Sequence, residues 1–376
     1  MRALVHILLS LLLIGCSSLR STPKRLVVER AWARSTLKSE YLGGRRQHRF
    51  APILTENLIL AANSIDGLVA YERSSGQMRW RMDIADGIEG GATLSEGKLY
   101  FGAGDGLFYA VNPLNGNILW TYPLKAEGLS RPTIKNGVVY VLGGNNVAHA
   151  LDAKTGKLLW LYNRREASNL SVRGGSQPAL SGDLVLIGFS DGALVALKKS
   201  SGSVMWETNL SRNKRFRDVD ASPVVDGETA FVSSYDGALY AVTVADGKIL
   251  WTVEDGGYDE VLLSKDKLFY SSTSGKIMAV DKVSGKTLWS RTNPDGISTA
   301  PSLIKNVLVV GEMDGALRFL DANSGQELST FDPGRGVTSK TTYDADQNRV
   351  FFMSADANLY ALAVNWKQFT KDWPWE

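Results

Sequence analysis

Cysteine and histidine are scarce in this sequence of 376 residues, which contains one cysteine and three histidines. A single cysteine cannot form an internal disulfide, so other contacts must hold the folded chain together. Three histidines give little material for a histidine metal cluster or a Ser/His/Asp triad. Positive charge is in slight excess only, with 42 Lys and Arg against 39 Asp and Glu, which excludes a polybasic binder of nucleic acid. We therefore expect no catalytic residues, no metal, no cofactor and no nucleic-acid partner.

Long apolar runs are also rare, and the one at the N-terminus extends only from Ala3 to Ile14. Roughly 20 apolar residues are needed to span a bilayer, so this run predicts a signal peptide over residues 1–15. Its end, "LIGC", resembles the lipobox of bacterial lipoproteins, which implies cleavage before Cys16 and attachment of lipid to that residue. The alternative is an ordinary signal peptide and a buried structural cysteine. We expect a lipidated Cys16 and a tether over residues 16–28.

One pattern, as in "DGALYAVTVADGKILW", occurs eight times, with copies that begin at residues 66, 105, 145, 191, 236, 274, 314 and 356. Each copy has a tight turn, an alternating strand, a second turn at glycine and a strand that in most copies carries tryptophan. A weaker pair of strands precedes each copy. Four short strands per period of about 40 residues are typical of a β-propeller blade. The sequence predicts an all-β fold, an eight-bladed β-propeller with four antiparallel strands per blade, as one domain over residues 29–366.

The two ends of this ring are incomplete in complementary ways. The eighth copy stops before its last strand, whereas "RAWARSTL" near the N-terminus is a strand without a blade and carries Trp32. We expect this N-terminal strand to complete the eighth blade and close the ring, which removes a free sheet edge. The seventh copy has Ser329 in place of tryptophan, which predicts weaker packing between blades there. Residues 367–376 form an aromatic C-terminal tail.

The pattern A-x-D-x-x-T-G-x-x-x-W, clearest from Ala150 to Trp160, resembles the repeat of propellers that bind pyrroloquinoline quinone (PQQ). The resemblance implies the fold and raises the hypothesis of a quinoprotein enzyme or sensor. Such an enzyme needs a quinone site, Ca²⁺ ligands and a catalytic carboxylate, usually on long insertions and often with adjacent cysteines. The short connections and the single cysteine of this chain do not fit that requirement.

The two longest intervals between copies are adjacent and contain residues 163–178 and 209–223. Both segments precede the first strand of a blade, so they are expected side by side on one face. Alternation and charge single out five candidate partner-binding residues: Leu170, Val172, Arg173, Asp218 and Asp220. A protein interface is one interpretation. The alternative is structural, with apolar residues that cap the core and an ion pair within the protein.

The lipobox, the eight repeats and the stretches "LSVRGGSQP" and "RDVDASP" together resemble the BamB family of β-barrel assembly lipoproteins. The resemblance implies a non-enzymatic scaffold on the periplasmic face of the outer membrane, and Ser17 after the cysteine fits outer-membrane delivery. It also implies that the five candidate residues contact the POTRA domains of the central Omp85-type protein. Unfolded outer-membrane proteins are a second candidate partner. An adaptor for another envelope complex remains the alternative within this class.

Overall fold

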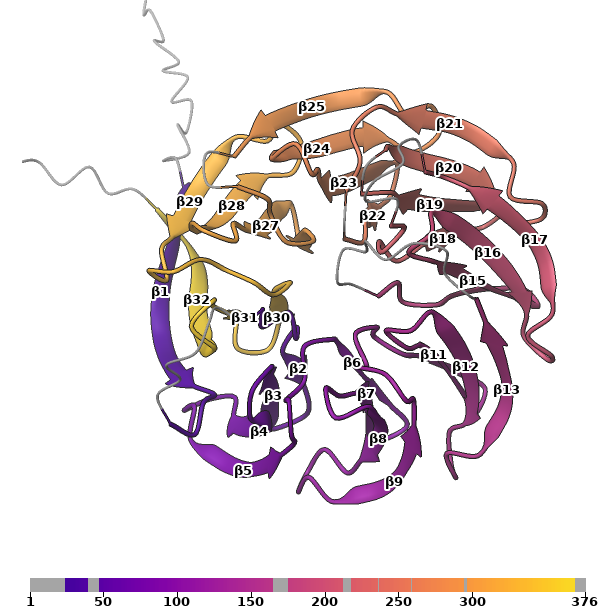
Figure 1. Ribbon diagram of the computed structural model, residues 1–376. Helices are drawn as coiled ribbons and strands as arrows, with labels where there is room; N and C mark the ends of the chain where they lie inside the picture. Colours follow the sequence, from indigo (N-terminus) through magenta and orange to yellow (C-terminus); the bar gives the residue numbers. More distant parts are fainter. Residues whose placement is uncertain are drawn as a thin grey trace, which may run out of the picture.

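A computed structural model describes residues 24–39, 47–164, 175–211, 218–235, 237–257, 259–293 and 296–368. Its 32 strands form eight antiparallel sheets of four strands, arranged as blades around a central axis (Figure 1). The predicted all-β, eight-bladed propeller is therefore confirmed. No helix among the described residues is long and apolar enough to cross a membrane.

In blades 1 to 7 the strands follow the chain from the innermost to the outermost position, and in blade 8 the outermost strand is β1, from the other end of the chain. Blades 1 to 4 consist of β2 (Ile53–Leu54), β3 (Leu58–Asn63), β4 (Gly67–Glu72), β5 (Met78–Asp83); β6 (Ala92–Ser95), β7 (Lys98–Gly102), β8 (Leu107–Val111), β9 (Ile118–Pro123); β10 (Thr133–Lys135), β11 (Val138–Leu142), β12 (Val147–Asp152), β13 (Leu158–Asn163); β14 (Ala179–Ser181), β15 (Leu184–Gly188), β16 (Ala193–Lys198), β17 (Val204–Asn209). Blades 5 to 8 consist of β18 (Val224–Asp226), β19 (Thr229–Ser233), β20 (Leu239–Thr243), β21 (Ile249–Val253); β22 (Leu262–Ser264), β23 (Lys267–Ser271), β24 (Lys276–Asp281), β25 (Thr287–Thr292); β26 (Ser302–Ile304), β27 (Val307–Gly311), β28 (Leu317–Asp321), β29 (Glu327–Phe331); β30 (Thr342–Asp344), β31 (Arg349–Met353), β32 (Asn358–Gln368) and β1 (Lys24–Ser35).

Blade 8 closes the ring with strands from both ends of the chain, as predicted. β1 pairs with β32 in an antiparallel register that runs from Lys24 opposite Gln368 to Ser35 opposite Asn358. The pairing is longer than expected at both ends. Residues 24–28, expected in the tether, belong to β1, and residues 367–368, expected in the tail, belong to β32. The signal peptide, Cys16 and the rest of the tail lie outside the described residues.

The repeated glycine and tryptophan connect neighbouring blades. Each tryptophan of an outermost strand lies against the glycine in the turn before the outermost strand of the next blade. At Gly156, where φ is +73°, a Cβ atom would lie 2.5 Å from the ring of Trp120, so only glycine allows this contact. The seven pairs are Trp32 with Gly76, Trp80 with Gly116, Trp120 with Gly156, Trp160 with Gly202, Trp206 with Gly247, Trp251 with Gly285 and Trp289 with Gly325.

Ser329 breaks this series for a structural reason. The next blade is the closing one, in which the third and fourth strands come from opposite ends of the chain and share no turn glycine. The expected weak packing is not what the structure shows, because other apolar contacts replace the tryptophan. Leu26 and Val28 of β1 join the apolar cluster of blades 7 and 8. Phe331 meets Tyr360 edge to face, with ring centroids 5.7 Å apart.

Candidate functional site

The described parts of the connectors between blades lie on one face of the ring. Each connector leaves the outermost strand of one blade and enters the innermost strand of the next, so every blade is traversed in the same direction. We call this side the connector face. The turns between the third and fourth strands, which carry the glycines described above, lie at the opposite ends of the strands. We call that side the hairpin face.

Three of the five predicted partner-binding residues, Leu170, Val172 and Arg173, lie outside the described residues. The described parts of their two connectors are directly hydrogen-bonded. Ser176 Oγ donates to the carbonyl of Ala221 at 3.3 Å, and the Gln177 N–H donates to Ser222 Oγ at 3.0 Å. For residues 175–178 and 218–223 the predicted side-by-side arrangement on one face is confirmed.

Asp218 and Asp220 are close in sequence but differ in environment. Asp218 is fully buried, and its backbone carbonyl accepts a hydrogen bond from the Tyr235 N–H at 3.0 Å. Val219 is buried between them, and its carbonyl passes so close to Gly188 that a Cβ there would lie 2.1 Å away. Asp220 is half-buried and lines a pocket on the axis. Of this pair, only Asp220 lines that pocket.

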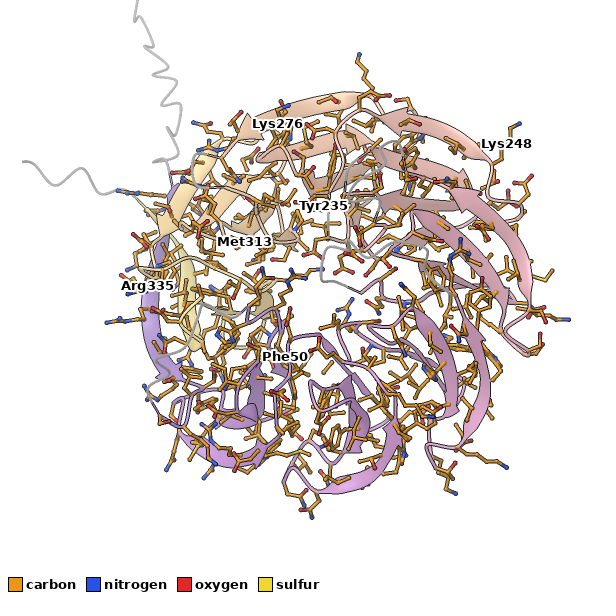
Figure 2. All side chains as sticks on the ribbon, in the orientation of Figure 1. Phe50, Tyr235, Lys248, Lys276, Met313 and Arg335 are labelled. Carbon is orange, nitrogen blue, oxygen red and sulfur yellow. The ribbon has the colours of Figure 1, made fainter. Side chains whose placement is uncertain are left out.

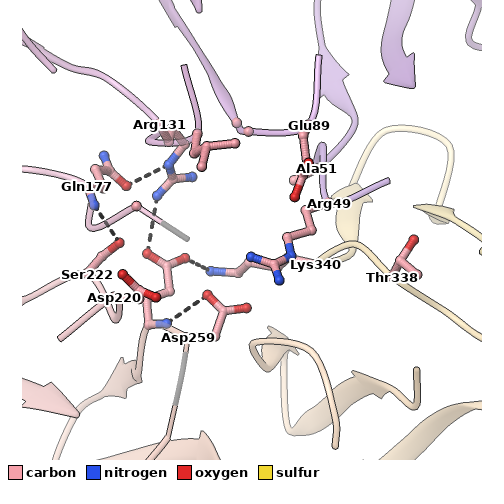
Figure 3. A pocket seen from close by; sticks show the side chains of 15 residues that line it. Arg49, Ala51, Glu89, Arg131, Gln177, Asp220, Ser222, Asp259, Thr338 and Lys340 are labelled. Atoms are coloured by element: carbon pink, nitrogen blue, oxygen red, sulfur yellow. Dashed lines mark hydrogen bonds and ion pairs between the residues drawn. The ribbon is translucent and has the colours of Figure 1, made fainter. Parts of the chain in front are cut away.

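The axial pocket, as we call it, opens among the connectors where the innermost strands begin (Figure 3). Its volume is about 130 Å³. The residues that line it come from the connectors into seven of the eight blades: Arg49, Ala51, Glu89, Gly90, Gly91, Leu129, Arg131, Gly175, Gln177, Asp220, Ser222, Asp259, Glu260, Thr338 and Lys340. The two connectors predicted to bind a partner therefore form part of its wall.

One carboxylate links three blades across this pocket. Glu260 lies in the connector before blade 6 and forms an ion pair with Lys340, in the connector before blade 8. The distance from Lys340 Nζ to Glu260 Oε1 is 2.5 Å. The other carboxylate oxygen of Glu260 lies 3.3 Å from Nη2 of Arg131, which precedes blade 3. Arg131 Nε also donates to Gln177 Oε1 at 2.6 Å (Figure 3). Because these blades are far apart in sequence, the network ties distant parts of the ring together.

The two neighbouring carboxyls in this network have opposite pKa shifts. Burial by itself raises the pKa of Glu260, but the charges of Lys340 and Arg131 outweigh burial, so the pKa lies below its usual value. The pKa of Asp259 is raised by burial and by the negative charge of Glu260. The Ala300 N–H, from the connector before blade 7, donates to Asp259 Oδ2 at 3.0 Å. The pocket thus combines charged groups of both signs rather than a field of one sign.

Sequence reasoning missed the axial residues, although the chain carries a signal for them. In five blades a proline comes shortly before the first strand, and the residue before it faces the axis or its rim: Ala51, Arg131, Gln177, Ser222 and Ala300. Glu260 and Lys340 occupy the same position in blades without that proline. The signal is the position of these residues, two before the first strand of a blade, and it can be recognised only when the sequences of the blades are aligned with each other.

The described residues do not fit quinone or metal chemistry. Small-molecule pockets begin at roughly 300 Å³, so a tricyclic quinone is too large for the axial pocket as it stands. No group of three or more His, Cys, Asp or Glu side chains in the described ranges is placed to hold a metal ion. His149 is buried in β12 and its pKa is lowered by burial to about 4, so it is neutral near pH 7.

A family model and the similar proteins of known name point to the same family. The model of the family described as "Outer membrane protein assembly factor BamB" matches residues 65–291, and a "beta-propeller protein" model matches residues 227–359. BamB of Salmonella typhimurium is 26% identical, over 94% of this chain and 97% of its own length. BamB of Escherichia coli is 28% identical, over 84% of this chain and 87% of its own.

Solved structures support the fold. The crystal structure of BamB from Moraxella catarrhalis has a TM-score of 0.74 and 23% identity, and the match covers 90% of this chain and all of that one. A quinohemoprotein alcohol dehydrogenase from Comamonas testosteroni reaches 0.72 at 14% identity, over 89% of this chain and 76% of its own. Both likenesses concern the propeller alone. The family match, in contrast, spans more than half of the sequence, and this chain belongs to the BamB family of outer membrane protein assembly factors.

Proposed function

We propose that this protein is a non-enzymatic scaffold of the outer-membrane β-barrel assembly machinery, anchored through a lipid on Cys16 to the periplasmic face of the outer membrane. Residues 1–15 are its signal peptide in this proposal. The connector face docks on the POTRA domains of the central Omp85-type protein and helps unfolded barrel proteins to insert. The proteins named as relatives are assembly factors, and family membership supports the same role here.

The observation that carries the proposed docking site is the direct contact between the two long connectors. Hydrogen bonds from Ser176 and Gln177 hold the described part of one connector against the other, next to the axial pocket. A rigid frame beneath loop residues lowers the entropy cost of docking. Leu170, Val172, Arg173 and Asp220 are then the contacts with the partner, and Arg173 is the proposed anchor because guanidinium groups are common at interface hot spots.

The burial of Asp218 determines which substitution tests this site. Arginine at that fully buried position would place an unpaired charge inside the protein and damage the fold, so Asp218→Arg is not informative. Arg173→Glu is the better variant. We expect it to reduce recovery of the POTRA protein in affinity purification from native membranes at least tenfold, because interface anchors contribute about 2 kcal/mol or more.

Lys248→Glu is the matched control, since it makes the same change of charge on the hairpin face. Lys248 is exposed, and Figure 2 places it at the outer rim of the ring. Urea unfolding of both variants should match the parent chain. Unchanged recovery of the POTRA protein by Arg173→Glu, with the control also unchanged, would exclude the proposed anchor.

The hypothesis of a quinoprotein enzyme or sensor has no comparable support. Dehydrogenases share the propeller at 14 to 15% identity, a level that concerns the fold alone. The axial pocket of this chain is bridged by the ion pairs of Glu260, and its volume is small. A scaffold role uses the connector face as it is, whereas a quinone site would require these ion pairs to open.

A further inference from the structure

A groove on the outer side of blade 8 has no role in the proposed docking. It is formed by residues 30–34 of β1, by Ser74 and Ser75 in the turn between β4 and β5, and by Arg349 at the start of β31. That turn belongs to the hairpin face, so the groove and the axial pocket lie on opposite faces. Its volume of about 660 Å³ holds an anion with a substituent.

Two guanidinium groups reach this groove, those of Arg34 and Arg349, and within the described ranges neither takes part in an ion pair. Arg30 also lines the groove, but it stands opposite Leu362 while Trp32 stands opposite Ala361, so its side chain leaves the other face of the strand. The acidic residues nearby in sequence pair with other cations: Arg73 with Asp344 and Asp346, Arg79 with Glu72, and Lys367 with Glu29. The groove therefore holds positive charge that no ion pair of the described residues neutralises.

Backbone carbonyls hold both guanidinium groups in place. Arg34 donates from Nε to Gly76 O at 2.8 Å, from Nη1 to Ala33 O at 2.8 Å and from Nη2 to Ser75 O at 3.1 Å. Arg349 donates from Nη1 to the carbonyls of Arg73 and Ser74, at 2.9 and 2.7 Å. Each guanidinium has five N–H donors, so both keep donors for a ligand. Neutral carbonyls fix the geometry and leave the charge in place.

Trp32 forms the floor between these arginines and adds an independent observation. It is 7% exposed, and the guanidinium carbon of Arg34 lies 5.9 Å from its ring centroid. Its indole Nε1 is buried and has no hydrogen-bond partner among the described residues, a state that it shares with Nε1 of Trp80. The corresponding Nε1 of Trp160 donates to Lys199 O at 2.7 Å. Here the corresponding carbonyl, Arg73 O, accepts from Arg349 instead.

We propose that this groove binds a phosphate group. Planar guanidinium groups form paired, charge-assisted hydrogen bonds with phosphate oxygens, and a phosphate supplies the negative charge that the two unpaired arginines lack. The ligand is a free phosphate or phosphomonoester, or the phosphodiester of a lipid headgroup. Because β1 contributes most of the groove and closes the ring, the bound anion stabilises the closed propeller.

Thermal unfolding of the purified mature chain, at constant ionic strength set with chloride, tests this proposal. The probes are inorganic phosphate and glycerophosphoglycerol, the water-soluble headgroup of phosphatidylglycerol. We expect at least one of them to raise the unfolding midpoint above the chloride baseline. Arg34→Gln should increase the dissociation constant derived from this titration about tenfold, the effect of losing one charge-assisted contact.

Arg25→Gln is the matched control, because Arg25 is exposed on the same strand and does not line the groove. Arg34 is chosen because its guanidinium lies beside Trp32 and the turn at Ser75. Each variant is compared with its own chloride baseline, so a change in stability without ligand does not enter the dissociation constant. Stabilisation by phosphate alone identifies a free phosphate or monoester, and stabilisation by the diester identifies a headgroup. No stabilisation above chloride by either probe, or an equal effect of Arg34→Gln and Arg25→Gln, overturns the proposal.

Discussion

The buried histidine of blade 3 makes the stability of the propeller depend on pH in a way that can be calculated. His149 is 5% exposed and packs edge to face against Tyr122, with ring centroids 5.5 Å apart. Burial lowers the pKa of His149 from 6.5 to about 4. Above pH 6.5 the imidazole is neutral in both the folded and the unfolded chain, so it has no effect. As the pH falls below 6.5, the unfolded chain binds a proton that the folded chain excludes, and stability is lost until about pH 4.

The size of this effect follows from the two pKa values. One pKa unit corresponds to about 1.4 kcal/mol, so lowering the pH from 7.5 to 5 costs about 2 kcal/mol of unfolding free energy through His149. The assay is urea unfolding at both pH values for the parent chain and for His149→Phe, which retains an aromatic ring and cannot titrate.

The comparison concerns the change with pH, so a constant stability offset in the variant does not matter. Other titrating groups are present in both proteins and cancel in the difference. We expect the parent chain to lose about 2 kcal/mol more than His149→Phe between the two pH values. Equal losses in the two proteins would show that His149 is protonated in the folded state and refute the reasoning from burial.

Two further predictions concern the closure of the ring. Glu260→Gln removes the charge shared by Lys340 and Arg131, and we expect it to lower the unfolding free energy in urea by about 2 kcal/mol, less than for a fully buried pair because both cations are partly exposed. No change in urea would mean that the network contributes nothing. Trp32→Ala removes the contact with Gly76 and should cost about 3–5 kcal/mol, the range for large buried aromatics. An unchanged urea midpoint would contradict the role of β1 as the closing strand.

The fold was predictable from the sequence because its determinants are local and repeated. Each period contains its own turn glycines and alternating strands, and the recurring tryptophan indicates how one blade contacts the next. The residue at which β1 begins could not be predicted in this way. Residues 24–28 look like a tether in isolation, and Leu26 becomes a core residue only through contacts with blades 7 and 8. Such contacts between the ends of a chain leave no local pattern.

The candidate site was predictable only in part, for a related reason. The unusual length of two connectors located them on one face, and their contact through Ser176 and Gln177 agrees with that. The alternation rule failed at Asp218 and Asp220, which were expected to share an environment. Residues two apart share a face in a strand, but residues 218–220 are not in a strand. Glu260 gains its partners only when the ring closes and brings three distant blades together.

In the proposed function, the two faces of the ring have different roles. β1 begins at Lys24 beyond the hairpin face and ends at Ser35, where the chain enters the connector face. Seven residues lie between Cys16 and Lys24, so the two residues are at most about 28 Å apart. Under the proposed anchoring, the hairpin side and its arginine groove stay near the membrane surface, where phosphate groups are abundant. The connector face then points away from the bilayer and is free to meet a partner in the periplasm. Binding of phosphate by the groove would help to hold that orientation, so the two proposals are compatible although each can fail alone.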